Sequence, residues 1–271
     1  MAINDISLTS GMRSNLISLQ GTVNLLNRTQ ERLSSGKKVN SALDNPTNFF
    51  AAQGHTNRAS DLTARKDGMS EAIQAVKAAD AGIKGITSLI ESAKGLTQSA
   101  RTADTAGRAS LATQFATMLT QITNLANDSG YKGTNLLDSD NLTVEFNEDG
   151  SNTLSVTGFD ASATAGLGIE AAANAWAADA DINAAVADLD AALLTLRSQS
   201  ASLASNLGVI TARQDFTNNM INTLITGADN LTLADTNEES ANMLMLQTRQ
   251  SLGTTALSLS SQAAQSVLKL F

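Results

Sequence analysis

The chain has 271 residues, with 18 Lys and Arg, 26 Asp and Glu, one His and no Cys, and its formal net charge is -8. The lack of cysteine excludes disulfide scaffolds and thiolate zinc sites, and a single histidine, His55, excludes two-histidine metal sites. Net negative charge argues against a general nucleic-acid binder, and no apolar run approaches the roughly 20 residues of a membrane span. We therefore expect no enzyme, no metal site and no cofactor, and neither nucleic acid nor a membrane as partner.

Charge is distributed unevenly along the chain. Residues 138–190 contain eleven acids and no Lys or Arg, so this segment alone carries -11. Residues 1–40 carry a net +3, and residues 241–271 contain Arg249 and Lys269 but no acid. A self-repelling acidic segment belongs in water, whereas weakly charged ends can be buried by assembly.

The N-terminal segment predicts a helix with a narrow apolar stripe. Its apolar residues recur at steps of three, four and seven, which is the a/d pattern of a coiled coil. The stripe consists of Met12, Leu16, Leu19, Val23, Leu26 and Leu33, with the polar Gln30 at one position of the seam. Such a helix is marginal in water when isolated and needs a partner.

A long helical region follows. Asn45-Pro46 is typical of an N-cap followed by proline at the first helical position, and helix-permissive sequence extends from there to about residue 128. Gly82, Gly85 and Gly95 weaken the prediction of one unbroken helix by roughly 1 kcal/mol each relative to Ala. Residues 104–108 predict a turn between two helices.

Mid-sequence patterns predict a small β-hairpin and then a return to helix. Residues 142–146 and 153–157 alternate with period two around Asp149-Gly150, as hairpin strands do around a turn. Residues 161–180 are rich in Ala and Gly and give no clear signal, and a further helix is expected from about Asp181 to Leu224.

The C-terminal segment repeats the rhythm of the N-terminal one. Its stripe consists of Met245, Leu252, Ala256, Leu259, Ala263 and Leu270, interrupted by Arg249 and Ser266. Each end is a suitable partner for the other, and we expect both stripes to form the assembly interface, where Gln30 and Arg249 fix the register. The expected fold is mainly α, with long antiparallel helices, paired terminal coiled-coil helices and a small mid-sequence hairpin.

Several motifs at separate places in the sequence resemble those of bacterial flagellins, and they are most similar to the flagellins of alphaproteobacteria. The N-terminal motifs are Leu19-Gln20, Leu33-Ser34-Ser35-Gly36, Asn40-Ser41-Ala42 and Asp44-Asn45-Pro46. Residues 130–137 resemble the turn that follows the second body helix, and the C-terminal motifs are residues 234–240 and 262–268. The likeness covers both ends in the expected order and most of the chain between them.

The resemblance implies a subunit of the extracellular flagellar filament. It implies an inner coiled-coil domain of residues 1–40 and 232–271, and a helical body of residues 41–231 with a hairpin region at about 141–158. No large outer domain is expected. The implied partners are further copies of the chain in a helical filament, the flagellar export apparatus, an export chaperone, the filament cap and hook-junction proteins.

Two other functions remain open from the sequence, namely a hook-filament junction protein and a soluble helical binding or receptor-ligand protein. An animal innate receptor recognises many flagellins through a body helix, where an arginine is the key contact. The corresponding stretch is residues 90–96, and Ser92 stands at the arginine position, so we expect this position not to permit recognition because a hydroxyl cannot replace a guanidinium.

The ends are further expected to order only when neighbouring subunits bury them. Burying six Leu-sized side chains of a seam contributes roughly 10 kcal/mol. Ordering about 70 residues costs more than this without intermolecular contacts. We therefore expect folding to be coupled to assembly. The resemblance to flagellins implies, in addition, that the chain is exported in an unfolded state.

Overall fold

A computed structural model describes residues 10–268 of the chain, with side chains to residue 266. Its helices are α1 (Ser10–Ser35), α2 (Pro46–Thr102), α3 (Thr105–Asp128), α4 (Asp179–Thr232) and α5 (Thr236–Leu268), with a short 3₁₀ turn at Ala173–Trp176. Strands β1 (Leu142–Glu145) and β2 (Thr153–Val156) form a two-stranded antiparallel sheet. The mainly α fold with a mid-sequence hairpin is therefore confirmed. Within residues 10–268, no helix is long and apolar enough to cross a membrane.

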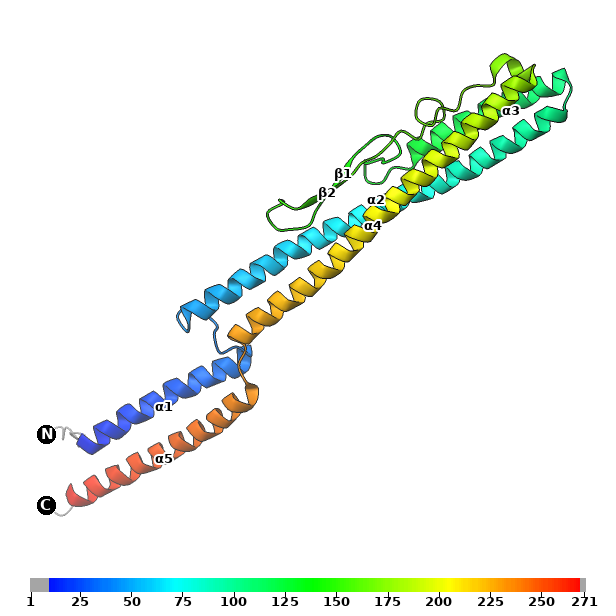
Figure 1. The fold of residues 1–271 in the computed structure, drawn as a ribbon. Coiled ribbons are helices and arrows are strands. Elements are labelled where there is room, and N and C mark those ends of the chain that lie inside the picture. The colour runs from blue at the N-terminus through cyan, green and yellow to red at the C-terminus, as the bar shows by residue number, and fades with distance from the viewer. Residues whose placement is uncertain (1–9, 269–271) are drawn as a thin grey trace, which may run out of the picture. The chain divides into compact units, whose positions relative to one another are not determined.

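The chain divides into two compact units. Unit 1 comprises residues 1–57 and 223–271, and unit 2 comprises residues 58–222. In unit 1, α1 and α5 lie side by side, whereas unit 2 gathers α3 and most of α2 and α4, together with the hairpin (Figure 1).

In unit 2, α2 and α4 run antiparallel in a constant register. The Gln214 amide donates to Ser70 Oγ at 2.7 Å, and Arg101 donates to Asn183 Oδ1 at 2.7 Å. Residues 70 and 101 are 31 apart on α2, as residues 183 and 214 are on α4, so neither helix slips against the other between these contacts. The apolar core that they share with α3 includes Ile86, Phe115 and Leu189, all fully buried.

The helix boundaries follow local capping chemistry. Asn45 Oδ1 accepts from the Asn48 N–H at 3.1 Å, and α2 begins at Pro46, as predicted. Asp104 caps α3 by accepting from the Gly107 N–H at 2.8 Å. The predicted break between two helices is therefore present, but it is confined to residues 103–104, and residues 105–108 of the predicted turn form the start of α3. The helix α2 nevertheless continues through Gly82, Gly85 and Gly95 to Thr102.

Two of these glycines are required by close packing. A Cβ at Gly82 would lie 2.6 Å from Leu137 Cδ1, and one at Gly85 would lie 2.8 Å from Leu125 Cδ2. Their weak helix propensity is offset because their missing side chains let α3 and the loop after it approach α2.

The hairpin is confirmed within one residue at each strand end. Leu142 pairs with Val156 and Glu145 with Thr153, and Gly150 in the turn has φ +70°. Its inner residues Val144 and Val156 are buried in the core of unit 2. Arg65 binds Glu145 and Arg58 binds Glu148, so the hairpin is fixed to α2 by two ion pairs.

The segment without a sequence signal contains a buried anchor. Trp176 is fully buried, and its ring lies 5.0 Å from that of Phe115 on α3. Asn174, Ala175 and Trp176 all have positive φ, between 46° and 57°, which non-glycine residues adopt only when their surroundings hold them there. The helix that follows begins at Asp179 and ends at Thr232, and is therefore longer than the predicted 181–224.

Candidate assembly interface

The two terminal helices pair antiparallel within unit 1. At one end of the pair, Arg32 Nη1 donates to Glu239 Oε1 at 2.8 Å. Further along, Gly253 of α5 faces Leu19 of α1 so closely that an added Cβ would lie 3.0 Å from Leu19 Cδ1. The ends of the chain therefore offer each other a partner.

The predicted stripe of α1 faces α5 at most positions. Met12 is buried, and Leu16, Leu19, Val23, Leu26 and Leu33 are all partly buried. Gln30 is exposed, and the neighbouring Thr29 is the buried polar residue instead. The polar position within this pair is therefore Thr29, one residue before the predicted seam position.

The predicted stripe of α5 is not buried against α1. Its described members Met245, Arg249, Leu252, Ala256, Leu259 and Ala263 are all exposed, and Leu270 lies outside the described residues. The side of α5 that is covered carries Leu246, Gln250, Gly253, Leu257 and Ala264. The covered series is thus displaced by one residue, about 100° around the helix, from the predicted stripe.

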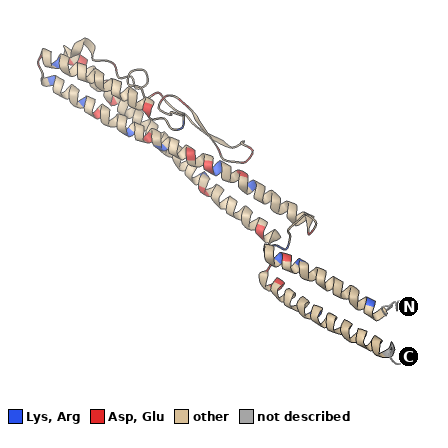
Figure 2. Ribbon diagram, turned by 180° about the vertical axis from the view of Figure 1, so that it is seen from behind, with Lys and Arg blue, Asp and Glu red and all other residues tan. Residues whose placement is uncertain are grey.

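This displacement leaves a line of large apolar side chains uncovered on α5. Met245, Leu252 and Leu259 follow one another at intervals of seven residues and are 46%, 65% and 61% exposed. We call these three residues the α5 apolar line. Between residues 240 and 268 the only charged residue is Arg249, and Figure 2 shows how little charge this helix carries beyond its first turn. Exposed apolar residues aligned in this way make this surface a candidate interaction site.

The opposite helix also has apolar residues that the stripe pattern missed. Ile17 and Leu25 of α1 are 68% and 51% exposed. They lie eight residues apart, which places them about 80° apart around the helix, and both fall outside the a/d series of the predicted stripe. Each terminal helix therefore has one face toward its partner in the chain and further apolar residues toward solvent.

Arg249 lies beside a small groove between α1 and α5. The groove has a volume of about 290 Å³ and is also lined by Asn15, Ser18, Leu19 and Leu252. Arg249 has no acidic partner within the described residues, so its guanidinium is available to a group outside this pair of helices.

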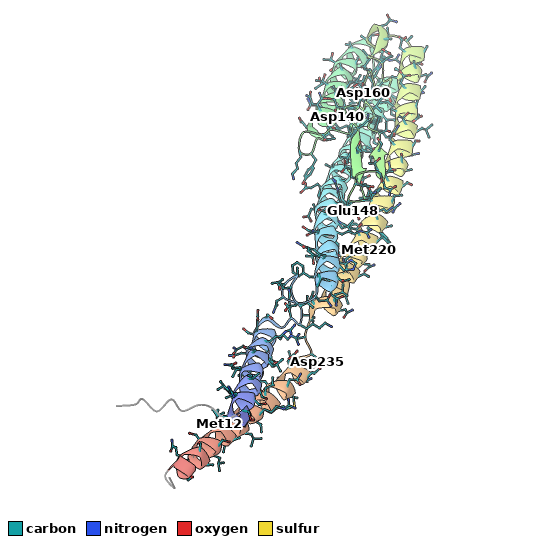
Figure 3. All side chains as sticks on the ribbon, turned by 90° about the vertical axis from the view of Figure 1, so that its left-hand side faces the viewer. Met12, Asp140, Glu148, Asp160, Met220 and Asp235 are labelled. Carbon is teal, nitrogen blue, oxygen red and sulfur yellow. The ribbon has the colours of Figure 1, made fainter. Side chains whose placement is uncertain are left out.

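A short backbone clasp joins the segments that connect to these helices. The Lys38 and Val39 N–H groups donate to Thr232 O at 2.8 and 3.3 Å, and the Ala234 N–H donates to Gly36 O at 3.0 Å. Gly36 has φ +69°, a conformation that favours glycine. The clasp fixes the α1–α2 linker to the α4–α5 linker. Asp235 stands at the second of these linkers (Figure 3).

The linker after the clasp is ordered by a carboxylate. Asp44 Oδ2 accepts from the backbone N–H groups of Asn40 and Ser41, both at 3.1 Å. These bonds, with Asn40 the larger influence, hold the pKa of Asp44 below its ordinary value of 3.8.

The remaining predicted position lies in unit 2. Ser92 is exposed on α2, and its hydroxyl donates to the Ser88 carbonyl at 2.9 Å. Among residues 10–268, no group of three His, Cys, Asp or Glu side chains is placed to hold a metal ion.

The chain is similar in sequence to proteins that are already known. Residues 3–142 match the bacterial flagellin N-terminal helical region. The chain is 31% identical to flagellin FljM and 30% identical to flagellin FljK of Caulobacter vibrioides, each over the whole of both chains. It is 37% identical to flagellin A of Rhizobium meliloti over 92 residues, which are 34% of this chain and 23% of that one. A crystal structure of Bacillus cereus flagellin aligns with TM-score 0.47 and 15% identity, over 55% of this chain and 88% of that one.

Proposed function

The chain belongs to the bacterial flagellin family, and we infer that it is a structural subunit that polymerises into the extracellular flagellar filament for swimming motility. The observation that carries the mechanism is the uncovered α5 apolar line. Since α1 packs on a different face of α5, we propose that a neighbouring copy of the chain covers Met245, Leu252 and Leu259.

We propose that residues 1–40 and 232–271 form the inner assembly domain and that residues 41–231 form the body. The assembly contact then consists of the two predicted stripes, with the α1 stripe organising the pair and the α5 stripe facing a neighbouring copy. Covering each side chain of the apolar line contributes on the order of 1 kcal/mol, because about half of each is already removed from water.

Contacts of this kind between different faces of identical subunits generate an open helix when the rotation does not close. The α5 apolar line and the exposed Ile17 and Leu25 of α1 are two such non-identical surfaces on one subunit. Gln30 and Arg249, both exposed, supply polar groups that select one register between copies.

Assembly also provides the reason for folding late. We propose that the export apparatus and an export chaperone handle the chain with its terminal helices unformed, and that these helices order at the filament tip beneath the cap. Hook-junction proteins would present the first acceptor surface. The thin apolar stripes of α1 and α5 support this, because narrow stripes are marginal without neighbours.

Seeded polymerisation tests the function. Purified full-length chain and a chain truncated after Leu244 are each mixed with short fragments of sheared filament and followed by negative-stain microscopy. The full chain should extend the seeds into long filaments, and the truncated chain should remain in solution. Filaments of the truncated chain would contradict the proposed role of α5, whereas short rings from the full chain would identify a junction protein.

A further inference from the structure

Unit 2 has a groove between α2 and α4 that neither α3 nor the loops cover. It contains two hollows of about 430 and 350 Å³. Both are lined by residues of α2 and α4 alone, with Ile73 and Ile83 from one helix and Leu196 and Leu207 from the other. The larger hollow is mainly apolar, whereas the smaller one is also lined by the polar Ser70, Gln74 and Gln214.

The charged residues that line the groove are all basic. They are Lys77 and Lys84 on α2 and Arg197 on α4, and no carboxylate lines either hollow. Lys84 pairs with Asp80 at 2.7 Å, but Lys77 and Arg197 make no ion pair with any described residue. Two unneutralised cations along the same open groove favour an acidic partner.

Another surface of the same unit has the complementary charge. Of the eleven acids between residues 138 and 190, four pair with bases of unit 2, namely Glu145, Glu148, Asp179 and Asp190. The other seven have no basic partner among the described residues, and Asp138, Asp140, Asp149 and Glu170 among them are exposed. The loops from Asp138 to Glu170, which we call the acidic loop layer, therefore carry unneutralised negative charge (Figure 3 labels Asp140 and Asp160).

We propose that the acidic loop layer of one copy docks on the basic α2–α4 groove of a second copy in the filament. The inference rests on the proposed function, since it names a contact between bodies of polymerised subunits. A contact between two different surfaces of the same chain can repeat from copy to copy, and it gives an open filament when the rotation between copies does not close. Electrostatic complementarity also fixes which surfaces meet, because like-charged alternatives are disfavoured.

Charge reversal separates this contact from the effect of total charge. The groove variant is Lys77→Glu with Arg197→Glu, the loop variant is Asp138→Lys with Glu170→Lys, and the combined variant contains all four changes. The four side chains make no ion pair or side-chain hydrogen bond with described residues, so folding should be retained. Far-UV circular dichroism checks this for each variant. A control, Asp61→Lys with Asp128→Lys, matches the charge change of the loop variant at exposed acids outside both surfaces.

For seeded growth of the full-length loop variant, docking and general charge repulsion predict opposite results. The loop variant reduces the net negative charge from -8 to about -4, so general repulsion between copies predicts better assembly than wild type. Docking predicts instead that the groove and loop variants each leave at least about tenfold more monomer unpolymerised, as like charges meet across the contact. The combined variant should recover near-wild-type growth, and the control should grow at least as well as wild type.

Wild-type growth keeps the two proposals distinct. If wild-type chain does not extend seeds, the proposed function fails. If wild-type chain does extend seeds, two results would each overturn the docking proposal. One is that the groove and loop variants leave the same amount of monomer as wild type, and the other is that the combined variant shows no recovery. Docking also predicts that the concentration of unpolymerised wild-type monomer increases between 0.05 and 0.5 M salt. The reason is that the Debye screening length falls to about 4 Å at the higher salt concentration, which weakens the attraction between the two surfaces.

Discussion

Arg32 and Glu239 lie 207 residues apart in the sequence, and their side chains meet at 2.8 Å where α1 ends and α5 begins. The arginine side chain is 28% exposed and the glutamate side chain 9%. Glu239 Oε2 is buried without a hydrogen-bond partner among the described residues, so Arg32 is the group that holds this carboxylate in place. The pair closes the terminal coiled coil next to the backbone clasp.

Removing the cation should therefore destabilise unit 1 more than removing both charges. Arg32→Met leaves a buried carboxylate unpaired and should lower the opening free energy of α1 and α5 by about 1–3 kcal/mol. Arg32→Met with Glu239→Gln should recover part of this loss, with a coupling of at least about 0.5 kcal/mol. Hydrogen exchange of α1 and α5 amides in assembled filaments measures both free-energy changes, and strictly additive losses would show that the two residues act independently.

The glycines of α2 provide a matched test of close packing. Gly82→Ala should lower the free energy of unfolding by about 1–3 kcal/mol, because the new methyl group meets the Ser129 and Leu137 side chains. Gly95→Ala should raise it by up to about 1 kcal/mol, because no atom lies within 4 Å of its Cβ position and alanine favours helix. Urea unfolding followed by the fluorescence of Trp176, the single tryptophan, measures both. Equal stabilisation by the two substitutions would contradict the packing account.

Tyr131 reports on the end of the loop beside α2. Its hydroxyl donates to Glu71 Oε2 at 2.9 Å, and this bond raises the pKa of Tyr131 above its ordinary 10.0. The bond to Lys132 lowers the pKa of Glu71, and the bond to Glu71 raises the pKa of Lys132. Since the raised pKa belongs to the folded state, the stability from this contact is fully present below pH 10 and is lost as pH rises through the folded pKa of Tyr131.

The single tyrosine makes this measurable by ultraviolet absorbance. The tyrosinate midpoint should lie above pH 10 in the folded chain and should fall in Glu71→Gln, where the acceptor loses its charge. An unchanged midpoint in that variant would show that Glu71 does not set the titration.

The α5 apolar line should govern assembly without governing the folding of the body. Leu252→Asp should raise the unpolymerised monomer concentration at least about tenfold, which corresponds to roughly 1.4 kcal/mol of lost contact energy. Gln247→Asp adds the same charge to an exposed position of α5 outside the line and should change it little. Sedimentation of seeded mixtures measures the difference, and equal effects of the two substitutions would assign the loss to charge alone.

Local signals were enough to predict the helix start at Pro46, the break at Asp104 and the hairpin around Gly150, because caps and turns are decided by neighbouring residues. They could not predict residues 161–180, where Trp176 is placed by its long-range contact with Phe115 and where three non-glycine residues have positive φ. No periodicity encodes such a contact.

The orientation of α5 was not predictable for a related reason. The series that packs on α1 includes Gln250 and Gly253, which carry no hydrophobic signal, whereas the exposed line of Met245, Leu252 and Leu259 carries a strong one. Close approach at Gly253 decides which face meets α1. The apolar pattern thus marked a surface that stays uncovered within the chain, and its role as an interface between copies stays a prediction.

Because the chain has no cysteine, Leu252→Cys places a unique thiol on the α5 apolar line, and its labelling by a maleimide tests the central claim most directly. Labelling should be fast in the monomer, at least about tenfold slower in assembled filament, and fast again after the same filament is dissociated, because a neighbouring copy covers the line. Equal labelling rates in monomer and filament would show that this face remains open to solvent, and would contradict the assignment of the α5 apolar line to the subunit interface.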